Sequence, residues 1–228
     1  DSAFTTWLHR IAVTTALNSM RKVKRIRERE EVLDDPDVHA STAREPDFDL
    51  KARLHAAIDA RLAADIIFPT WLLLECCAEF GREHPDTRLE ITESVLGGTE
   101  EALTEGRVDL VVGGIVPGGF LGDPLMQVRF VCAAAPSHPL HQLGRTLTLD
   151  DLRQHRHLVV RDSGALRSRS GGWLNERRWT VSNKATSIRA ACMGLGYAWY
   201  PEENIREELS SDALRPLPLA EGRERFVT

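Results

Sequence analysis

The fold of this chain is decided by residues 62–114, which read LAADIIFPTWLLLECCAEFGREHPDTRLEITESVLGGTEEALTEGRVDLVVGG. A short apolar run over 62–64 stops at Asp65, and Pro69 stands where proline favours the first turn of a helix. Gly81 and Pro85 predict the end of this helix. The apolar residues between these limits recur at helical spacing: Leu72, Leu73, Cys76, Cys77 and Phe80.

Two more strands and a second helix complete the unit. Alternation over 89–92 predicts a strand with Leu89 and Ile91 facing inward, because successive strand side chains point to opposite faces. A helix is expected at about 99–105 and an apolar strand at 108–112. The order β-α-β-α-β is typical of open α/β sheets, which bind small molecules beyond the carboxyl ends of their strands.

These residues also carry a resemblance to a known family. FPTWLLLECCAEFGREHPDTRLEITE followed by LTEGRVDLVVGG is similar to the start of the effector-binding domain of LysR-type transcriptional regulators. Further along, VCAAAPSHPL resembles that family's crossover into a second lobe. WTVSNKATSIRAACMGLGYAWYP resembles its strand, its capped helix and its "G-x-G-(hydrophobic)-x-x-x-P" motif.

The resemblance implies an α/β fold of the two-lobed, periplasmic-binding-protein-like type 2 over 61–228, with lobe I at 61–130 and lobe II at 131–222. It also implies that the segment which closes lobe I in the family is missing. We expect polar residues at strand ends and helix starts to line an effector cleft between the lobes. They are Thr70, Ser94, Thr99, Ser163, Ser182, Asn183 and Thr186.

Two features favour a carboxylate-bearing effector in this cleft. The helix start near Asn183 offers unpaired N–H groups, which bind anions. The loop RDSGALRSRSGGW, over 161–173, borders the cleft in the family and carries three arginines that could pair with a carboxylate. Solvated surface arginines are the alternative for the loop. Structural capping is the alternative for the polar residues, since Ser, Thr and Asn are preferred caps.

The other chemistry-bearing residues form no catalytic motif that we can place in one site. The resemblance makes His138 a turn residue, and alternation around His155 and His157 predicts exposed side chains rather than metal ligands. The cysteines include no C-x-x-C pair and are expected to be small buried hydrophobes in a reducing cytosol: Cys76, Cys77, Cys132 and Cys192. We therefore expect no enzyme activity, no cofactor and no metal.

Residues 1–60 differ in character from the rest. Seven Lys or Arg residues lie from Arg10 to Arg29, whereas 30–49 hold eight acidic residues and read as a solvated linker. FTTWLHRIAVTTALNSMRKVKR resembles the DNA-reading helix of region 2 in extracytoplasmic-function sigma factors, which implies RNA polymerase as a partner. A solvated basic helix is the alternative. The resemblance implies nucleic-acid contacts from Trp7, Arg10, Arg21, Lys22, Lys24 and Arg25.

The overall composition limits the classes of partner and the cellular location that we expect. The chain is 42% hydrophobic with a net charge of −5, which by itself indicates neither nucleic acid nor an anionic membrane as a partner. No run approaches the roughly 18 to 20 apolar residues of a membrane span. The charged N-terminal segment is unlike a signal peptide, so we expect a cytoplasmic protein.

The leading hypothesis is therefore the ligand-sensing domain of a bacterial transcriptional regulator. The resemblance implies a homodimer formed through the helix at 71–80 and its neighbouring strand. It also implies DNA binding through a winged helix that this chain lacks. One alternative is a sigma-like transcription initiation protein that uses its N-terminal helix. Another is a solute-binding protein of the same fold, which the absence of a signal peptide disfavours.

Overall fold

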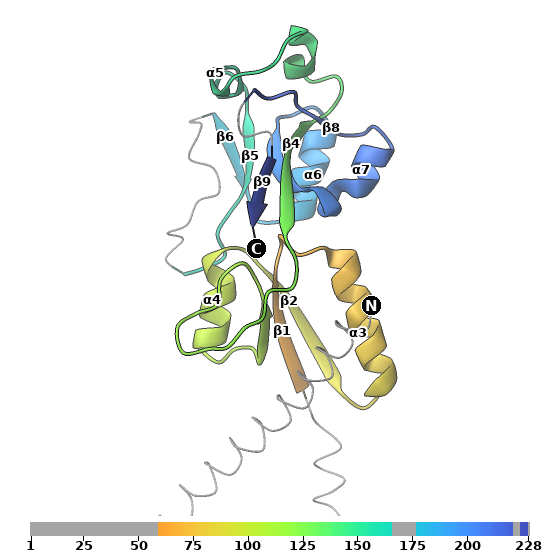
Figure 1. Ribbon diagram of the computed structural model, residues 1–228, viewed down its shortest axis with the longest axis vertical. Helices are drawn as coiled ribbons and strands as arrows, with labels where there is room; N and C mark the ends of the chain where they lie inside the picture. Colours follow the sequence, from red (N-terminus) through yellow and green to blue (C-terminus); the bar gives the residue numbers. More distant parts are fainter. Residues whose placement is uncertain (1–58, 166–176, 221–223, 228) are drawn as a thin grey trace, which may run out of the picture.

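The computed structural model describes residues 59–165, 177–220 and 224–227. They form two α/β lobes stacked along the long axis of the molecule and joined near its middle (Figure 1). The six candidate nucleic-acid contacts and the acidic linker lie outside the described residues.

Lobe I follows the predicted order of elements. It contains β1 (Asp59–Asp65), α3 (Thr70–Glu83), β2 (Arg88–Ser94), α4 (Gly97–Thr104) and β3 (Leu110–Val112). The strands pair in parallel in the order β2-β1-β3, and α3 and α4 lie on opposite sides of the sheet (Figure 1). The central strand is therefore covered on both faces, and its residues Leu62, Ala63 and Ala64 are all buried.

Three boundaries in lobe I differ from the sequence prediction. Helix α3 continues past Gly81 to Glu83 and ends just before Pro85. Strand β3 begins at Leu110, because the backbone N–H of Val108 still donates to Ala102 O at 3.2 Å in the turn that leaves α4. Helix α4 begins at Gly97, two residues earlier than expected.

The predicted inward face of β2 is only partly covered. Leu89 is half-buried, but Ile91 is 37% exposed, so its predicted burial is wrong. Strand β2 lies at the edge of a three-stranded sheet and has β1 as its only described neighbour. Alternation identified the apolar residue correctly, but the described residues supply no element to cover it.

Lobe II is built around β4 (Val128–Ala134). Antiparallel partners of β4 are β7 (Ala198–Pro201), β8 (Arg215–Pro216) and β9 (Glu224–Val227). Strands β5 (His157–Val160) and β6 (Arg178–Val181) pair in parallel, and a bridge from His157 to Tyr197 joins them to the start of β7. The helices are η2 (Pro139–Leu143), α5 (Leu149–Arg153), α6 (Lys184–Cys192), η3 (Glu202–Ile205) and α7 (Arg206–Ser210).

The core of lobe II lies on both faces of β4. Val131 and Ala133 pack in one cluster with Leu158 and Tyr200, whereas Cys132 and Ala134 pack in another that includes Leu140, Leu147 and Leu152. Alternate residues of one strand thus enter two cores, as the two-residue period of a strand requires. Helix α5 begins with a capping box that Thr148 and Asp151 form.

The histidines of lobe II are packed rather than solvated. His157 is 3% exposed and stacks on Tyr197 with ring centroids 5.1 Å apart, so its predicted exposure is wrong. The physical reason is that β5 lies inside the lobe, between β6 and the bridge to Tyr197. His155 is half-buried and packs edge-on against His138, with the two ring centroids 5.2 Å apart. His138 begins η2 and its Nδ1 accepts from the Leu140 N–H at 3.3 Å, which confirms it as a turn residue.

The four cysteines are free, and Cys76 and Cys132 are buried. Burial raises the pKa of the Cys76 thiol to about 11, with a smaller contribution from Cys77. Burial also raises the pKa of Cys77 and of Cys192. Because the thiolate is the reactive form, these three cysteines behave as apolar packing residues at neutral pH.

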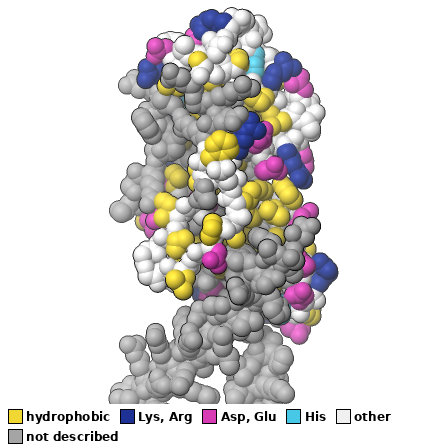
Figure 2. Space-filling model, in the orientation of Figure 1, with side chains coloured by type: hydrophobic (Ala, Val, Ile, Leu, Met, Phe, Trp, Pro, Cys, Tyr) yellow, Lys and Arg dark blue, Asp and Glu magenta, His cyan; other side chains and the backbone are white. Residues whose placement is uncertain are grey.

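Some apolar side chains lie on the surface instead of in either core. Hydrophobic atoms gather across the middle of the molecule in the view of Figure 2, near the level where the lobes join. The most exposed large apolar side chains include several from the segment between β3 and β4: Ile115, Val116, Phe120 and Leu121. Within 59–165, 177–220 and 224–227, no helix is long and apolar enough to cross a membrane.

Candidate functional site

A buried carboxylate organises the end of β1. Asp65 is 5% exposed, and its Oδ1 accepts from the Ile67 N–H at 3.1 Å. Its Oδ2 accepts from the Leu96 N–H at 2.9 Å and from the Thr99 hydroxyl at 3.3 Å. Burial raises the pKa of Asp65, whereas these three donors act in the opposite direction. The carboxylate thus ties β1 to the turn before α4, where Leu96 has a positive φ of 52°.

Ser94 and Thr99, two of the predicted cleft residues, are brought together by this network. Their hydroxyl oxygens are 2.7 Å apart, and the side chains are 4% and 3% exposed. Since Thr99 also donates to Asp65, the pair has its hydrogen-bond partners inside lobe I. In this arrangement the two hydroxyls join the end of β2 to the first turn of α4.

Ser163 contacts lobe I from the loop that follows β5. Its hydroxyl oxygen accepts from the Val95 N–H at 2.9 Å and donates to Val95 O at 3.2 Å, and its own N–H donates to Val95 O at 3.1 Å. Gly98 makes this approach possible, because a β carbon there would lie 2.9 Å from the carbonyl carbon of Ser163 and closer still to its hydroxyl. The Ala165 N–H adds a bond of 2.7 Å to Glu101 Oε2 on α4.

A second contact between the lobes involves Thr70, the first residue of α3. The Lys184 ammonium donates to Thr70 Oγ1 at 2.8 Å and lies 3.6 Å from Glu93 Oε1. The Thr70 hydroxyl in turn donates to Glu93 Oε1 at 3.4 Å. Lys184 is the first residue of α6, so the starts of a lobe I helix and a lobe II helix face each other here. The Lys184 ammonium connects the starts of these two helices.

The remaining predicted residues lie beside Lys184. The Asn183 side chain caps α6 by accepting from the N–H groups of Ala185 at 2.7 Å and Thr186 at 3.3 Å. The side chains of Ser182 and Thr186 are exposed. Of the predicted residues, Thr70 and Ser163 therefore form hydrogen bonds between the lobes. Ser94 and Thr99 bond each other within lobe I, and Asn183 caps α6.

Sequence reasoning missed Lys184, Glu93 and Asp65. Lys184 directly follows the predicted cap, and a long basic residue at a helix start was the available signal for it. The strand prediction over 89–92 stopped short of Glu93, and Asp65 was read only as the end of an apolar run. Of the three loop arginines that supported the expectation of a carboxylate, Arg167 and Arg169 lie outside the described residues.

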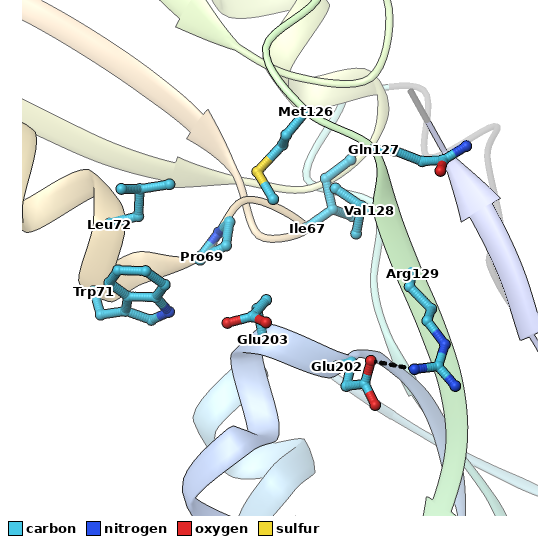
Figure 3. A pocket seen from close by; sticks show the side chains of 10 residues that line it. All are labelled: Ile67, Pro69, Trp71, Leu72, Met126, Gln127, Val128, Arg129, Glu202 and Glu203. Carbon is cyan, nitrogen blue, oxygen red and sulfur yellow. Dashed lines mark hydrogen bonds and ion pairs between the residues drawn. The ribbon is translucent and has the colours of Figure 1, made fainter. Parts of the chain in front are cut away.

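A pocket of about 350 Å³ is lined by residues of both lobes and of the segment that enters β4 (Figure 3). Ile67, Pro69, Trp71 and Met126 give it an apolar wall, and Arg129 pairs with Glu202 at 2.7 Å on its far side. The indole Nε1 of Trp71 is buried without a hydrogen-bond partner in the described part of the chain. Because the whole lining comes from three distant segments, no sequence pattern could have indicated this pocket.

The same side of the junction has a third direct link between the lobes. Asn204 of η3 donates through Nδ2 to Ile66 O at 2.7 Å. The Arg206 guanidinium lies over the Trp71 ring at 4.2 Å. In the described ranges, no group of three or more His, Cys, Asp or Glu side chains is placed to hold a metal ion.

Two α/β lobes that meet at helix starts, with polar side chains reaching across, define a two-lobed small-molecule-binding domain. The family model described as LysR substrate binding domain matches residues 59–227, and the chain belongs to this family. The HTH-type transcriptional regulator YeeY of Escherichia coli (strain K12) is 30% identical over 159 residues, which cover 67% of this chain and 52% of YeeY. PunR of the same organism is 28% identical over 144 residues, 59% of this chain and 46% of PunR.

Solved structures show the same fold. The regulatory domain of CcmR from Synechocystis PCC6803, in complex with 2-PG, has a TM-score of 0.59 at 15% identity, covering 74% of this chain and 84% of that one. The effector-binding domain of QuiR in complex with shikimate has a TM-score of 0.53 at 16% identity, with 74% and 84% covered. The predicted fold is confirmed. The chain spans about half the length of the curated relatives it matches.

Proposed function

We propose that this chain senses a small molecule as part of a transcriptional regulator, and that the effector lies between the lobes. The observation that carries the proposal is the meeting of Thr70 and Lys184 across the junction, at the starts of α3 and α6. An effector held there touches both lobes and changes their relative position, because binding favours whichever arrangement it contacts best. Acting on transcription, the whole protein would work in the cytoplasm and bind DNA through a winged helix.

A carboxylate-bearing effector is the class that the cleft suits best. Lys184 places a positive charge at the start of α6, next to the positive end of the helix dipole. The Thr70 hydroxyl supplies a neutral group on the facing lobe. Catalysis is not part of the proposed function.

The effector proposal predicts ligand-dependent stabilisation. In a thermal-shift screen of small carboxylates, amino acids and aromatic acids, at least one compound should raise the melting temperature, since ligand bound to the folded state stabilises it. Thr70→Ala and Ser163→Ala should each reduce that shift. Met126→Trp, which fills the pocket of Figure 3, is the control and should leave the shift intact. A screen in which no compound stabilises the wild-type chain contradicts the proposal.

We also propose a homodimer formed through α3 and β2. Leu74 on α3 is 54% exposed and Ile91 on β2 is 37% exposed, so the two elements present uncovered apolar side chains. Leu74→Glu should therefore shift the wild-type dimer toward the monomer in sedimentation velocity, by about tenfold or more in dissociation constant, because burying an unpaired charge is unfavourable. Leu143→Glu, at a 44% exposed position of lobe II, is the matched control. If both variants dimerise like the wild type, the interface lies elsewhere.

A further inference from the structure

Lys184 and Glu93, the charged residues beside Thr70, differ in how deeply they are buried and in how closely they approach their partners. The Lys184 side chain is 12% exposed, whereas the Glu93 side chain is 45% exposed. Lys184 bonds Thr70 at 2.8 Å, but Glu93 lies 3.6 Å from Lys184 and 3.4 Å from Thr70. Arg129 and Glu202, by comparison, approach to 2.7 Å. Glu93 is therefore the loosely bound member of its pair.

Because Lys184 is more deeply buried than Glu93, the two residues depend on their ion pair to different extents. A cation that is largely removed from water needs an anionic or polar partner, so Lys184 requires one whether or not an effector is bound. A carboxylate that is nearly half exposed can return to water with little loss, and exposed ion pairs are weak for this reason. Another anion can therefore replace the Glu93 carboxylate on Lys184 more easily than Lys184 can leave the pair.

We propose that the Glu93 carboxylate and the carboxylate of the effector compete for the same position on Lys184, and that the effector displaces Glu93 when it binds. The inference rests on the proposed function of the cleft. Glu93 is then a competitor within the chain. It reaches Lys184 from lobe I, so the pair also holds the lobes together until an effector takes over that contact. The affinity for carboxylates is set by the difference between the two anions and not by Lys184 alone.

The two residues of the pair consequently have opposite effects on binding. Glu93→Gln keeps an oxygen that can accept from the Thr70 hydroxyl but removes the competing charge. It should tighten the binding of carboxylates by about fivefold, within the modest range of an exposed ion pair. Lys184→Gln removes the recognising charge and should weaken the same ligands by at least about tenfold, since hydrogen bonds to charged groups are the stronger ones. A merely structural ion pair would lower affinity when either partner is lost.

Titration calorimetry on the full chain tests the inference with benzoate and shikimate as probes, each beside its uncharged amide. We expect Glu93→Gln to tighten the acids and leave the amides unchanged. Glu90→Gln is the matched control, because it removes an exposed charge of the same sign from the same strand at a residue that alternates to the other face. Glu93→Asp, which keeps the charge but shortens its reach, is a second variant and should give a smaller gain.

The outcomes separate this inference from the proposed function. Acids that bind the wild type and gain nothing in Glu93→Gln overturn the exchange of anions and leave the sensing function intact. An equal gain in Glu90→Gln also overturns it, because the effect is then a general one of charge. Binding of the amides alone contradicts the choice of a carboxylate. If neither acids nor amides bind any variant, while the wider thermal-shift screen is also empty, both proposals are wrong.

Discussion

Replacing Asp65 with alanine should lower the free energy of unfolding by about 3 kcal/mol. The change deprives the N–H groups of Ile67 and Leu96 and the hydroxyl of Thr99 of their acceptor. A buried donor left without a partner costs about 1 to 3 kcal/mol, and part of that loss is recovered where water can enter. Chemical denaturation followed by far-UV circular dichroism measures the loss.

Two further variants isolate the cause of that loss. Asp65→Asn keeps one acceptor oxygen and removes the charge, so it should lose about half as much stability as the alanine variant. Asp150→Ala removes a carboxylate that is 82% exposed and paired with Arg153, and its effect should be far smaller. Equal losses at Asp65 and Asp150 would show that the buried network contributes nothing special.

Acid should destabilise the chain between pH 6.5 and about 4 through His138. The side chain is 4% exposed, and burial, with a smaller effect from His155, lowers the pKa of His138 from 6.5 to about 4. In this window the unfolded chain binds a proton that the folded chain does not, so stability is complete above pH 6.5 and is lost as the pH falls. A shift of this size corresponds to about 3 kcal/mol.

His138→Asn tests the origin of this acid sensitivity. The asparagine side-chain oxygen can accept from the Leu140 N–H in place of Nδ1, and asparagine is a preferred cap. Unfolding free energies measured at pH 7, 5.5 and 4.5 should therefore fall less steeply in the variant than in the wild type. The same slope in both proteins would assign the acid sensitivity to other groups.

Local patterns in the sequence predicted most of the fold because they report local physics. The apolar spacing of α3 identified Leu73 and Cys76, which are buried, and the polar residue before α6 identified Asn183 as its cap. Ile91 shows the limit of such patterns. Alternation reveals which side of a strand is apolar, but burial depends on whether another element covers that side.

The contacts of the candidate site could be predicted only in part, because they join residues that are distant in the sequence. Thr70 and Lys184 are 114 positions apart, and Asp65 and Leu96 are 31 apart. Ser94 and Thr99 were expected to line the cleft as polar residues at a strand end and a helix start. That they satisfy each other and Asp65 follows from the packing of lobe I, which no spacing in the sequence reveals.

The close approach of Gly98 to Ser163 limits how near the two lobes can come to each other at this edge. Where two lobes touch through long side chains, changes of rotamer allow the distance between the lobes to vary continuously. Here a short side chain and the main chain of Ser163 lie directly against lobe I. The Ser163 N–H and hydroxyl both bond Val95, and Gly98 has no side chain between the two lobes. Repulsion between such atoms rises steeply, so the lobes have one seated distance at this edge. Any separation of the lobes at this edge therefore breaks the hydrogen bonds between Ser163 and Val95, and any closer approach is blocked at Gly98.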